Sequence, residues 1–138
     1  MTAKEYLQQA RSLDMLINAK QDELYALRLT ATSVSSPALG DKVKSGGTNN
    51  TMQIVDKIIA LQEVINSEID RLVELKAEIH SRIEQLSDPY EKLILTERYL
   101  NNKSRLEISE LLHYEERNTQ YLHGKALQHF APFCIDLQ

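Results

Sequence analysis

The sequence has no tryptophan, a single cysteine, three prolines and four glycines among its 138 residues. Because Cys134 has no second cysteine to pair with, the chain cannot form an internal disulfide, which fits a reducing compartment. So little proline and glycine favours long helices over sheets and tight turns. The absence of any uninterrupted run of about 18 apolar residues excludes a membrane-spanning helix. The first residues, MTAKEYLQQARS, lack the basic and apolar regions of a secretory signal, so we expect a cytoplasmic protein.

Patterns that carry catalysis or metal binding are also missing. The four histidines show neither the i, i+4 pairing nor the cysteine companions of a metal site, so we interpret them as packing or solvated side chains. Gly46-Gly47 lacks the strand and the Lys-Ser/Thr pair that a phosphate-binding loop needs. The acidic residues are scattered over the outer faces of helices. We therefore expect no enzyme, no cofactor, no metal and no small-molecule substrate.

The chain has little excess of positive charge anywhere. Its 16 basic and 20 acidic residues give a net charge of −4, which argues mildly against nucleic-acid binding. The acidity is uneven, however. Residues 52–86 carry four basic and seven acidic side chains, net −3, whereas residues 88–131 carry six and seven, net −1. Any DNA affinity of one copy should therefore be weak and sensitive to salt.

Two long segments have the apolar periodicity of amphipathic helices. The first covers residues 2–30, with Thr2 and Glu5 spaced as a capping box. The second covers residues 52–86 and would extend roughly 52 Å. Because one such stripe is not stable alone in water, we expect an antiparallel hairpin, with any surplus end docking on the C-terminal part or on another subunit. The Ser-, Gly- and Asn-rich stretch 31–51 between them reads as a flexible loop, most mobile near residues 45–47.

The apolar stripe of the second helix allows two interpretations. It can be the core of the hairpin, or it can be a seam that joins two copies into a homodimer. The side chains proposed for an oligomer or partner interface all belong to this stripe. They are Ile58, Leu61, Ile65, Ile69, Leu72 and Ile79.

The residues after the hairpin predict three short helices. Asp88 caps the first, and Pro89 occupies its first position. Ser104 and Glu107 form a capping box for the second. The third begins near Glu115, after a short turn. The predicted fold is thus all-α, with a helical hairpin (1–87), a three-helix domain (88–131) and a tail (132–138).

The last two helices have the lengths and the tight connection of a helix-turn-helix motif. In that motif the first helix braces the second, and the second enters the major groove. Ile108 and Leu111 should pack against Leu122 and Ala126, and the small Ser109 should lie where the helices approach closely. The same frame can also be purely structural, or can dock on another protein.

The segment LLHYEERNTQYLHGKALQHF resembles the second half of region 4 of bacterial primary sigma factors. The shared features are the Leu112 position, the apolar Tyr114 and the triplet Lys125-Ala126-Leu127. RYLNNKSRLEISELL is similar to the sigma segment that precedes it. The whole layout also resembles the ArpU and RinA late-transcription regulators of phages of Gram-positive bacteria, although the likeness of the hairpin is architectural.

The resemblance implies a set of DNA-contacting residues on the last helix, with Glu116, Arg117, Gln120 and Tyr121 facing base edges. Helical spacing agrees in part, because it places positions 117, 120, 121 and Gly124 on one face. Arginine can donate two hydrogen bonds to guanine, and glutamine can pair with adenine. The candidates for phosphate contacts, which position without specifying, are Lys125, Lys103, Arg105 and Arg98.

This sequence departs from the sigma pattern in two places. Glu115 stands where the family usually has a Ser or Thr cap, so initiation of the last helix is expected to be weaker. Glu116 replaces a frequent basic residue, and two adjacent carboxylates near phosphates would repel them. The departures weaken the expected DNA contact of one copy, which a dimer would double.

Three functional hypotheses follow. The first is a phage-type transcriptional regulator in the bacterial host cytoplasm that binds double-stranded DNA as a homodimer. The second is an interaction protein that does not bind DNA and docks through its hairpin on host RNA polymerase or another protein. The third is a DNA-recognition subunit for phage packaging. Sequence-selective DNA binding discriminates the first hypothesis from the second.

Overall fold

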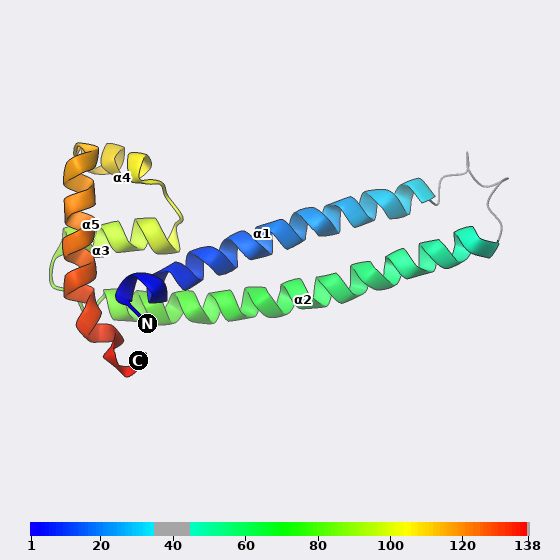
Figure 1. Cartoon of the computed structure of the whole chain (residues 1–138), viewed down its shortest axis with the longest axis horizontal. Coiled ribbons are helices and arrows are strands. Elements are labelled where there is room, and N and C mark those ends of the chain that lie inside the picture. The colour runs from blue at the N-terminus through cyan, green and yellow to red at the C-terminus, as the bar shows by residue number, and fades with distance from the viewer. Residues whose placement is uncertain (35–44, 138) are drawn as a thin grey trace. The chain divides into compact units, whose positions relative to one another are not determined.

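The computed structural model describes residues 1–34 and 45–137, and within them the chain is helical with no strand (Figure 1). The all-α prediction is confirmed. None of the helices in these ranges combines the length and the apolarity needed to cross a membrane. In chain order the helices are α1 (Ala3–Val34), α2 (Ser45–Ile83), α3 (Pro89–Leu95), the π-helical turn η2 (Thr96–Leu100), α4 (Arg105–Leu112), α5 (Glu116–Phe130) and the 3-10 helix η3 (Ala131–Leu137).

Contacts within the chain define two compact units. The hairpin unit comprises Met15–Arg71, and the C-terminal unit comprises Met1–Asp14 together with Leu72–Gln138. Each long helix thus contributes one part to each unit. The division describes packing, and the predicted domain boundary after residue 87 stays a prediction.

In the hairpin unit, α1 and α2 lie side by side and run in opposite directions (Figure 1). Ile17 and Leu24 of α1 are buried, and Ile65 of α2 is buried with them. The predicted antiparallel hairpin is confirmed here, because the two apolar stripes cover each other. Ile58, Leu61 and Ile69 are half-buried along the same seam of α2.

Polar side chains join the two helices of the hairpin unit along its edges. Lys20, which interrupts the apolar stripe of α1, forms an ion pair with Glu68 of α2. Arg28 donates through Nη2 to the side-chain oxygen of Gln62 at 2.9 Å. These pairs fix which residues of α1 lie opposite which residues of α2.

The predicted loop at residues 31–51 is wrong at both of its ends. Residues 31–34 continue α1, and residues 45–51, with Gly46 and Gly47 among them, begin α2. Helix propagation adds one hydrogen bond for each residue fixed, which offsets the cost of about 1 kcal/mol for each glycine. The middle of the predicted loop, residues 35–44, lies outside the described residues.

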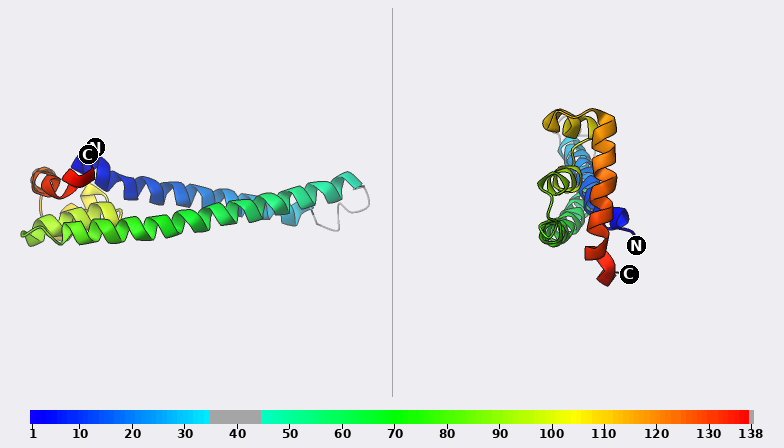
Figure 2. Two further views of the ribbon diagram at one scale, coloured as in Figure 1. Left: turned by 90° about the horizontal axis from the view of Figure 1, so that it is seen from below. Right: turned by 90° about the vertical axis from the view of Figure 1, so that its left-hand side faces the viewer.

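In the C-terminal unit, α5 crosses α3 and α4 at a steep angle, and the first turns of α1 lie beside the end of α5 (Figures 1 and 2). The ring of Tyr6 stacks on Phe130 with centroids 6.3 Å apart. The guanidinium of Arg82 lies 5.4 Å from the Tyr6 ring centroid. The end of α2 that α1 leaves uncovered therefore packs in the C-terminal unit. This is one of the two predicted outcomes; the other was docking on another subunit. The fully or nearly fully buried side chains of this unit include Leu7, Ile79, Ile83, Ile94, Leu95, Tyr99, Ile108 and Ala126, and Leu72 is also buried.

The predicted caps of the short helices are present. The Asp88 carboxylate accepts from the Tyr90 N–H at 2.8 Å. At the start of α4, Ser104 Oγ accepts from the Glu107 N–H at 3.2 Å, and the Glu107 carboxylate accepts from the Ser104 N–H at 3.1 Å. Thr2 and Glu5 form the same reciprocal box at the start of α1. Local sequence signals thus decide where these helices begin.

A π-helical turn separates α3 from the connection to α4. The Asn101 N–H donates to the Thr96 carbonyl at 3.0 Å, five residues back, and the Lys103 N–H donates to the Glu97 carbonyl at 2.9 Å. The wider turn holds one more residue than an α-helical turn. The predicted single helix from 88 to 100 is therefore an α-helix followed by a π turn.

The predicted packing of Leu111 is wrong. Leu111 is 48% exposed, so it does not pack in the α4–α5 contact, whereas Ile108 and Ala126 do. A helix of only two turns presents one narrow face to its neighbour, and Ile108 occupies that face. Ala131–Leu137, most of which belong to the predicted tail, form the 3-10 helix η3, and Cys134 within it is buried.

Candidate nucleic-acid interface

The turn between α4 and α5 sets the angle between the two helices. α4 ends at Leu112 and α5 begins at Glu116, so three residues connect them. His113 has φ 58° and ψ 37°, the left-handed conformation that ends many helices. The Tyr114 N–H then donates to the Ser109 carbonyl at 3.0 Å. Histidine is among the non-glycine residues that tolerate this conformation better, so the tight turn forms without glycine.

A buried pair of hydroxyl groups holds α4 against α5. Ser109 Oγ donates to Thr119 Oγ1 at 2.8 Å, and the Thr119 hydroxyl lies 3.3 Å from the Glu115 carbonyl, to which it donates. Both side chains are nearly inaccessible to solvent. The close approach predicted at Ser109 is confirmed, but sequence reasoning missed Thr119. Its position three residues after the start of the helix, in phase with Ala126, was the signal available.

The first turn of α5 is less well capped than that of α4. Glu115 occupies the cap position in an extended conformation, and its side chain makes no capping hydrogen bond. In contrast, α4 has the full capping box described above. The expectation of weaker initiation for α5 agrees with this geometry.

The residues expected at base edges lie together on the solvent side of α5. Tyr121 is 66% exposed, and the Lys125 ammonium lies 5.4 Å from its ring centroid. A side-chain carbon at Gly124 would meet no other group within 4 Å, so internal packing does not require glycine there. All the α5 candidates are exposed, namely Glu116, Arg117, Gln120, Tyr121, Gly124 and Lys125.

The three phosphate candidates outside α5 differ in their exposure and in the internal contacts that their side chains make. Arg105 is exposed at the start of α4. Lys103 is half-buried, and its ammonium pairs with Glu97 Oε2 at 3.2 Å. Arg98 is half-buried and donates through Nη1 to the Lys103 carbonyl at 3.0 Å. Two of the three thus serve the connection before α4, in addition to any role toward a ligand.

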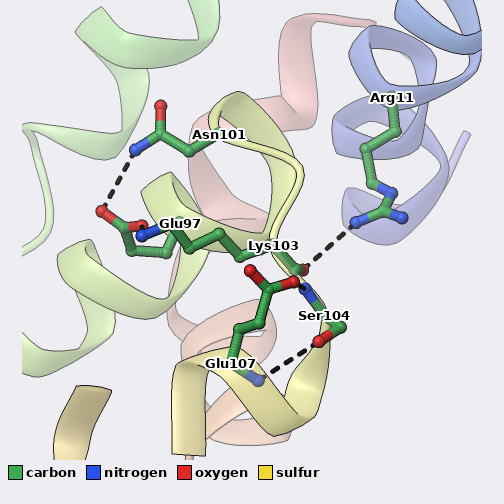
Figure 3. Close-up of polar contacts among 6 residues, drawn as sticks. All are labelled: Arg11, Glu97, Asn101, Lys103, Ser104 and Glu107. Atoms are coloured by element: carbon green, nitrogen blue, oxygen red, sulfur yellow. Dashed lines mark hydrogen bonds and ion pairs between the residues drawn. The ribbon is translucent and has the colours of Figure 1, made fainter. Parts of the chain in front are cut away.

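Figure 3 shows this connection, which residues 101–104 form between η2 and α4. Asn101 and the Lys103 ammonium both point toward the Glu97 carboxylate, and Asn101 Nδ2 donates to its Oε1 at 3.1 Å. From the other side, Arg11 of α1 donates through Nη1 to the Lys103 carbonyl at 3.4 Å and to the Arg98 carbonyl at 2.9 Å. Arg11 was not a sequence candidate, because its place beside α4 depends on the tertiary packing of α1.

A neutral histidine lies on the inner side of α5. The Tyr99 hydroxyl and His123 Nε2 are 2.7 Å apart, and their rings stack with centroids 5.7 Å apart. Burial, followed by the charges of Arg105, Arg98 and Lys4, lowers the pKa of His123 to about 4. Burial also raises the pKa of Tyr99. At neutral pH the hydroxyl therefore donates to an uncharged imidazole, which ties α5 to η2.

A separate cavity of about 370 Å³ lies at the opposite end of α5. Glu91 is buried in its wall, and both of its carboxylate oxygens lie within 2.9 Å of His129 Nδ1. Asp88 and Ser87 also line it. No group of three or more histidine, cysteine or carboxylate side chains able to hold a metal ion occurs in the described parts of the chain. We interpret the Glu91–His129 pair as a structural link between α3 and α5.

One comparison with known proteins finds a family. A protein-family model described as "Protein of unknown function (DUF1492)" matches residues 33–129. This range takes in α2 and nearly all of the three short helices that follow. No curated protein and no solved structure matches the chain.

Proposed function

The chain belongs to the DUF1492 family, and we propose that it is a phage-type transcriptional regulator that binds double-stranded DNA through α4 and α5. In this proposal α4 braces α5, and α5 enters the major groove. Arg117 and Gln120 read base edges, and Tyr121 lies beside them. Arg105 and Lys125 contact backbone phosphates.

The observation that supports this proposal best is the contrast between the two faces of α5. Its inner face is anchored by Thr119, His123 and Ala126, whereas its outer face carries polar and charged side chains that are all exposed. Gly124 in that outer face costs about 1 kcal/mol of helix stability relative to alanine. Since no internal contact requires the glycine, a groove that must approach the backbone closely explains it.

The test is binding of the purified protein to DNA at low salt, first to fragments selected from random sequence. Arg117→Ala and Gln120→Ala should each abolish sequence-selective binding, because a good base contact contributes about 1–3 kcal/mol of discrimination. Gel-shift titrations with the selected duplex and with a random duplex of equal length measure this. If the wild-type protein shifts neither its own upstream DNA nor any selected fragment at low salt, the proposal is wrong.

Matched controls come from the hairpin unit. Arg71 and Gln53 of α2 are exposed, so Arg71→Ala and Gln53→Ala remove the same side-chain types outside the motif. Both control variants should bind the selected duplex like the wild type. Loss of binding in the controls would point to a general effect of charge or stability instead of base contact.

A second candidate function is docking on another protein, with host RNA polymerase as the expected partner. The observation that favours it is a group of exposed apolar side chains on the hairpin unit. Tyr25 and Leu29 of α1 are 66% and 54% exposed, and Val55 and Ile59 of α2 are 42% and 53% exposed. The two residues on each helix lie one turn apart, and large contiguous patches of exposed apolar side chains mark interaction surfaces. A protein that binds polymerase but no duplex would support this candidate over the first.

A homodimer is also part of the first proposal. Ile65, Leu72 and Ile79 of the predicted interface are buried within a single copy, so they are not accessible to a second copy while the hairpin is intact. We propose instead that the exposed group around Leu29 and Ile59 joins two copies. Two motifs would then double the number of phosphate contacts and fix a half-site spacing.

A further inference from the structure

Three arginine side chains converge at the start of α4, and among the described residues none of them has a carboxylate partner. Arg11 and Arg98 both donate through Nη1 to the same oxygen, the Lys103 carbonyl, at 3.4 and 3.0 Å. Arg105 lines the same small cavity as Arg98, together with Gln120 of α5. The three guanidinium groups come from α1, η2 and α4, so only the folded C-terminal unit brings them together.

Two acidic side chains of this region, Glu97 and Glu107, have other partners. Glu97 pairs with the Lys103 ammonium and accepts from Asn101. The Glu107 carboxylate accepts from the Ser104 N–H in the capping box. Within the part of the chain that the structure describes, Arg105 forms neither a hydrogen bond nor an ion pair. The positive charge of the cluster is therefore not neutralised by the protein.

The cluster carries an electrostatic cost in the free protein. Burial, followed by the charge of Arg11, lowers the pKa of Arg98, and Arg105 lowers it further. The charges of Arg105 and Arg98 also contribute, after burial, to the low pKa of His123 on α5. An anion among the three guanidinium groups would offset this repulsion and would accept their remaining N–H donors, which are suited to phosphate oxygens.

We propose that Arg11, Arg98 and Arg105 form a phosphate-binding site that holds a backbone phosphate of DNA beside the base-reading face of α5. The inference rests on the proposed DNA-binding function and extends it to the first helix of the chain. Gln120 links the two sites, since it lines the cavity shared by Arg98 and Arg105 and lies on the exposed face of α5. A phosphate held here fixes the depth at which α5 enters the groove.

The experiment compares salt dependence on two duplexes. The affinities of the wild type, Arg105→Gln and Arg11→Gln are measured from 50 to 200 mM KCl, on a selected duplex and on a random duplex. Each variant should lose a similar factor, roughly 3- to 10-fold, on both duplexes, and its plot of log affinity against log salt should be shallower by about 1. Arg71→Gln, the matched control on α2, should keep the wild-type slope. Unchanged slopes in both variants would overturn the proposal.

Arg11 also anchors the connection before α4, so its replacement by glutamine can disturb the fold. Arg11→Lys keeps the charge and should retain the wild-type slope, even if the thermal midpoint falls. Arg105 makes no internal bond, so Arg105→Gln should fold normally and decides the question alone if Arg11→Gln does not fold.

Inorganic phosphate distinguishes failure of this site from failure of the proposed function. At equal ionic strength, phosphate should raise the thermal midpoint of the wild type above its value in chloride, and Arg105→Gln should lose that rise. If phosphate stabilises only the wild type but no duplex binds, the anion site stands and the DNA-binding function fails. If duplexes bind with wild-type slopes in the variants, the function stands and the backbone contact proposed here fails.

Discussion

Side chains in the contact between α4 and α5 satisfy one another without water. Ser109 donates to Thr119, and Thr119 donates to the Glu115 carbonyl, so neither hydroxyl is buried without a partner. A buried hydroxyl that lacks a hydrogen bond would cost about 1–3 kcal/mol. Because both side chains are small, the helix axes approach closely while the polar groups remain paired. The same small size makes this contact intolerant of larger residues.

His123 should make the stability of the protein depend on acid. In the folded protein its pKa is about 4, whereas in an unfolded chain a histidine titrates near 6.5. As the pH falls from 6.5 to 4, the unfolded chain binds a proton that the folded chain does not, so the free energy of unfolding decreases. After allowance for partial exposure of the ring, we expect a loss of roughly 1–2 kcal/mol over this window.

Denaturant unfolding at several pH values between 4 and 8 measures this loss. His123→Gln should flatten the dependence between pH 6.5 and 4, because it removes the titrating group. His80→Gln, at an exposed position on α2, should leave the dependence as in the wild type. Equal acid sensitivity in His123→Gln and the wild type would show that another group is responsible.

At the scale of the helix, Gly124 lowers the stability of α5 relative to alanine and leaves the backbone accessible at that position. Gly124→Ala should raise the free energy of unfolding by about 1 kcal/mol, since alanine is a better helix former and the space beside it is open. If α5 enters a groove, the added methyl group should also weaken DNA binding. Chemical denaturation and gel-shift titration of the same preparation measure both effects.

Asn118→Ala serves as the matched control for Gly124→Ala. Asn118 is exposed on α5 and lies about 100° around the helix from Arg117 and about 160° from Gln120, at the edge of the proposed DNA-facing side. It should gain a little stability and lose little affinity. A more stable Gly124→Ala protein with unchanged affinity would contradict a close approach of DNA to this backbone.

The starts of α3 and α4 could be predicted from the sequence, because caps depend on neighbouring residues, whereas the end of α1 and the start of α2 could not. Asp88 and Ser104 mark the starts of their helices, because each stands in a cap pattern that is visible in the sequence. Leu111 was placed wrongly, since a helix of two turns gives too few apolar positions to fix its phase. Thr119 was missed, because a threonine in a polar stretch gives no sign of burial beyond its helical phase with Ala126 until its partner Ser109 is placed opposite.

The arginine cluster could not be predicted from the sequence in full. Arg98 and Arg105 lie near the motif in sequence, so they were candidates from the start. Arg11 is 87 residues away from its hydrogen-bond partner at Arg98. Only the packing of α1 in the C-terminal unit brings it there, and no local pattern encodes that contact. The fold class can thus be predicted from periodicity, whereas the composition of the proposed binding site depends on tertiary structure.

For the whole molecule, the net charge of −4 is a smaller obstacle to DNA binding than the total alone suggests. The acidic surplus of residues 52–86 lies on α2, whereas Arg11, Arg98 and Arg105 are concentrated beside α4. Local concentration of charge matters because interactions beyond about 8–10 Å are largely screened at physiological salt. A weak, salt-dependent contact by each copy remains the expectation.

Self-association should follow from the exposed apolar group on the hairpin unit. Sedimentation equilibrium at high protein concentration should show a dimer, and the double variant Leu29→Ser/Ile59→Ser should shift it to monomer. Val64, which is 44% exposed on α2, provides the control Val64→Ser. A wild-type protein that remains monomeric at the highest concentration reached would reject the dimer.

The π-helical turn at Thr96–Leu100 also limits how this chain can change length during evolution. Because such a turn holds one residue more than an α-helical turn, losing a residue here would restore ordinary helix instead of breaking it. The deletion would rotate the preceding side chains by about 100° relative to those that follow. A relative shorter by one residue at this point should therefore hold its α4 connection with side chains from other positions than Glu97 and Arg98.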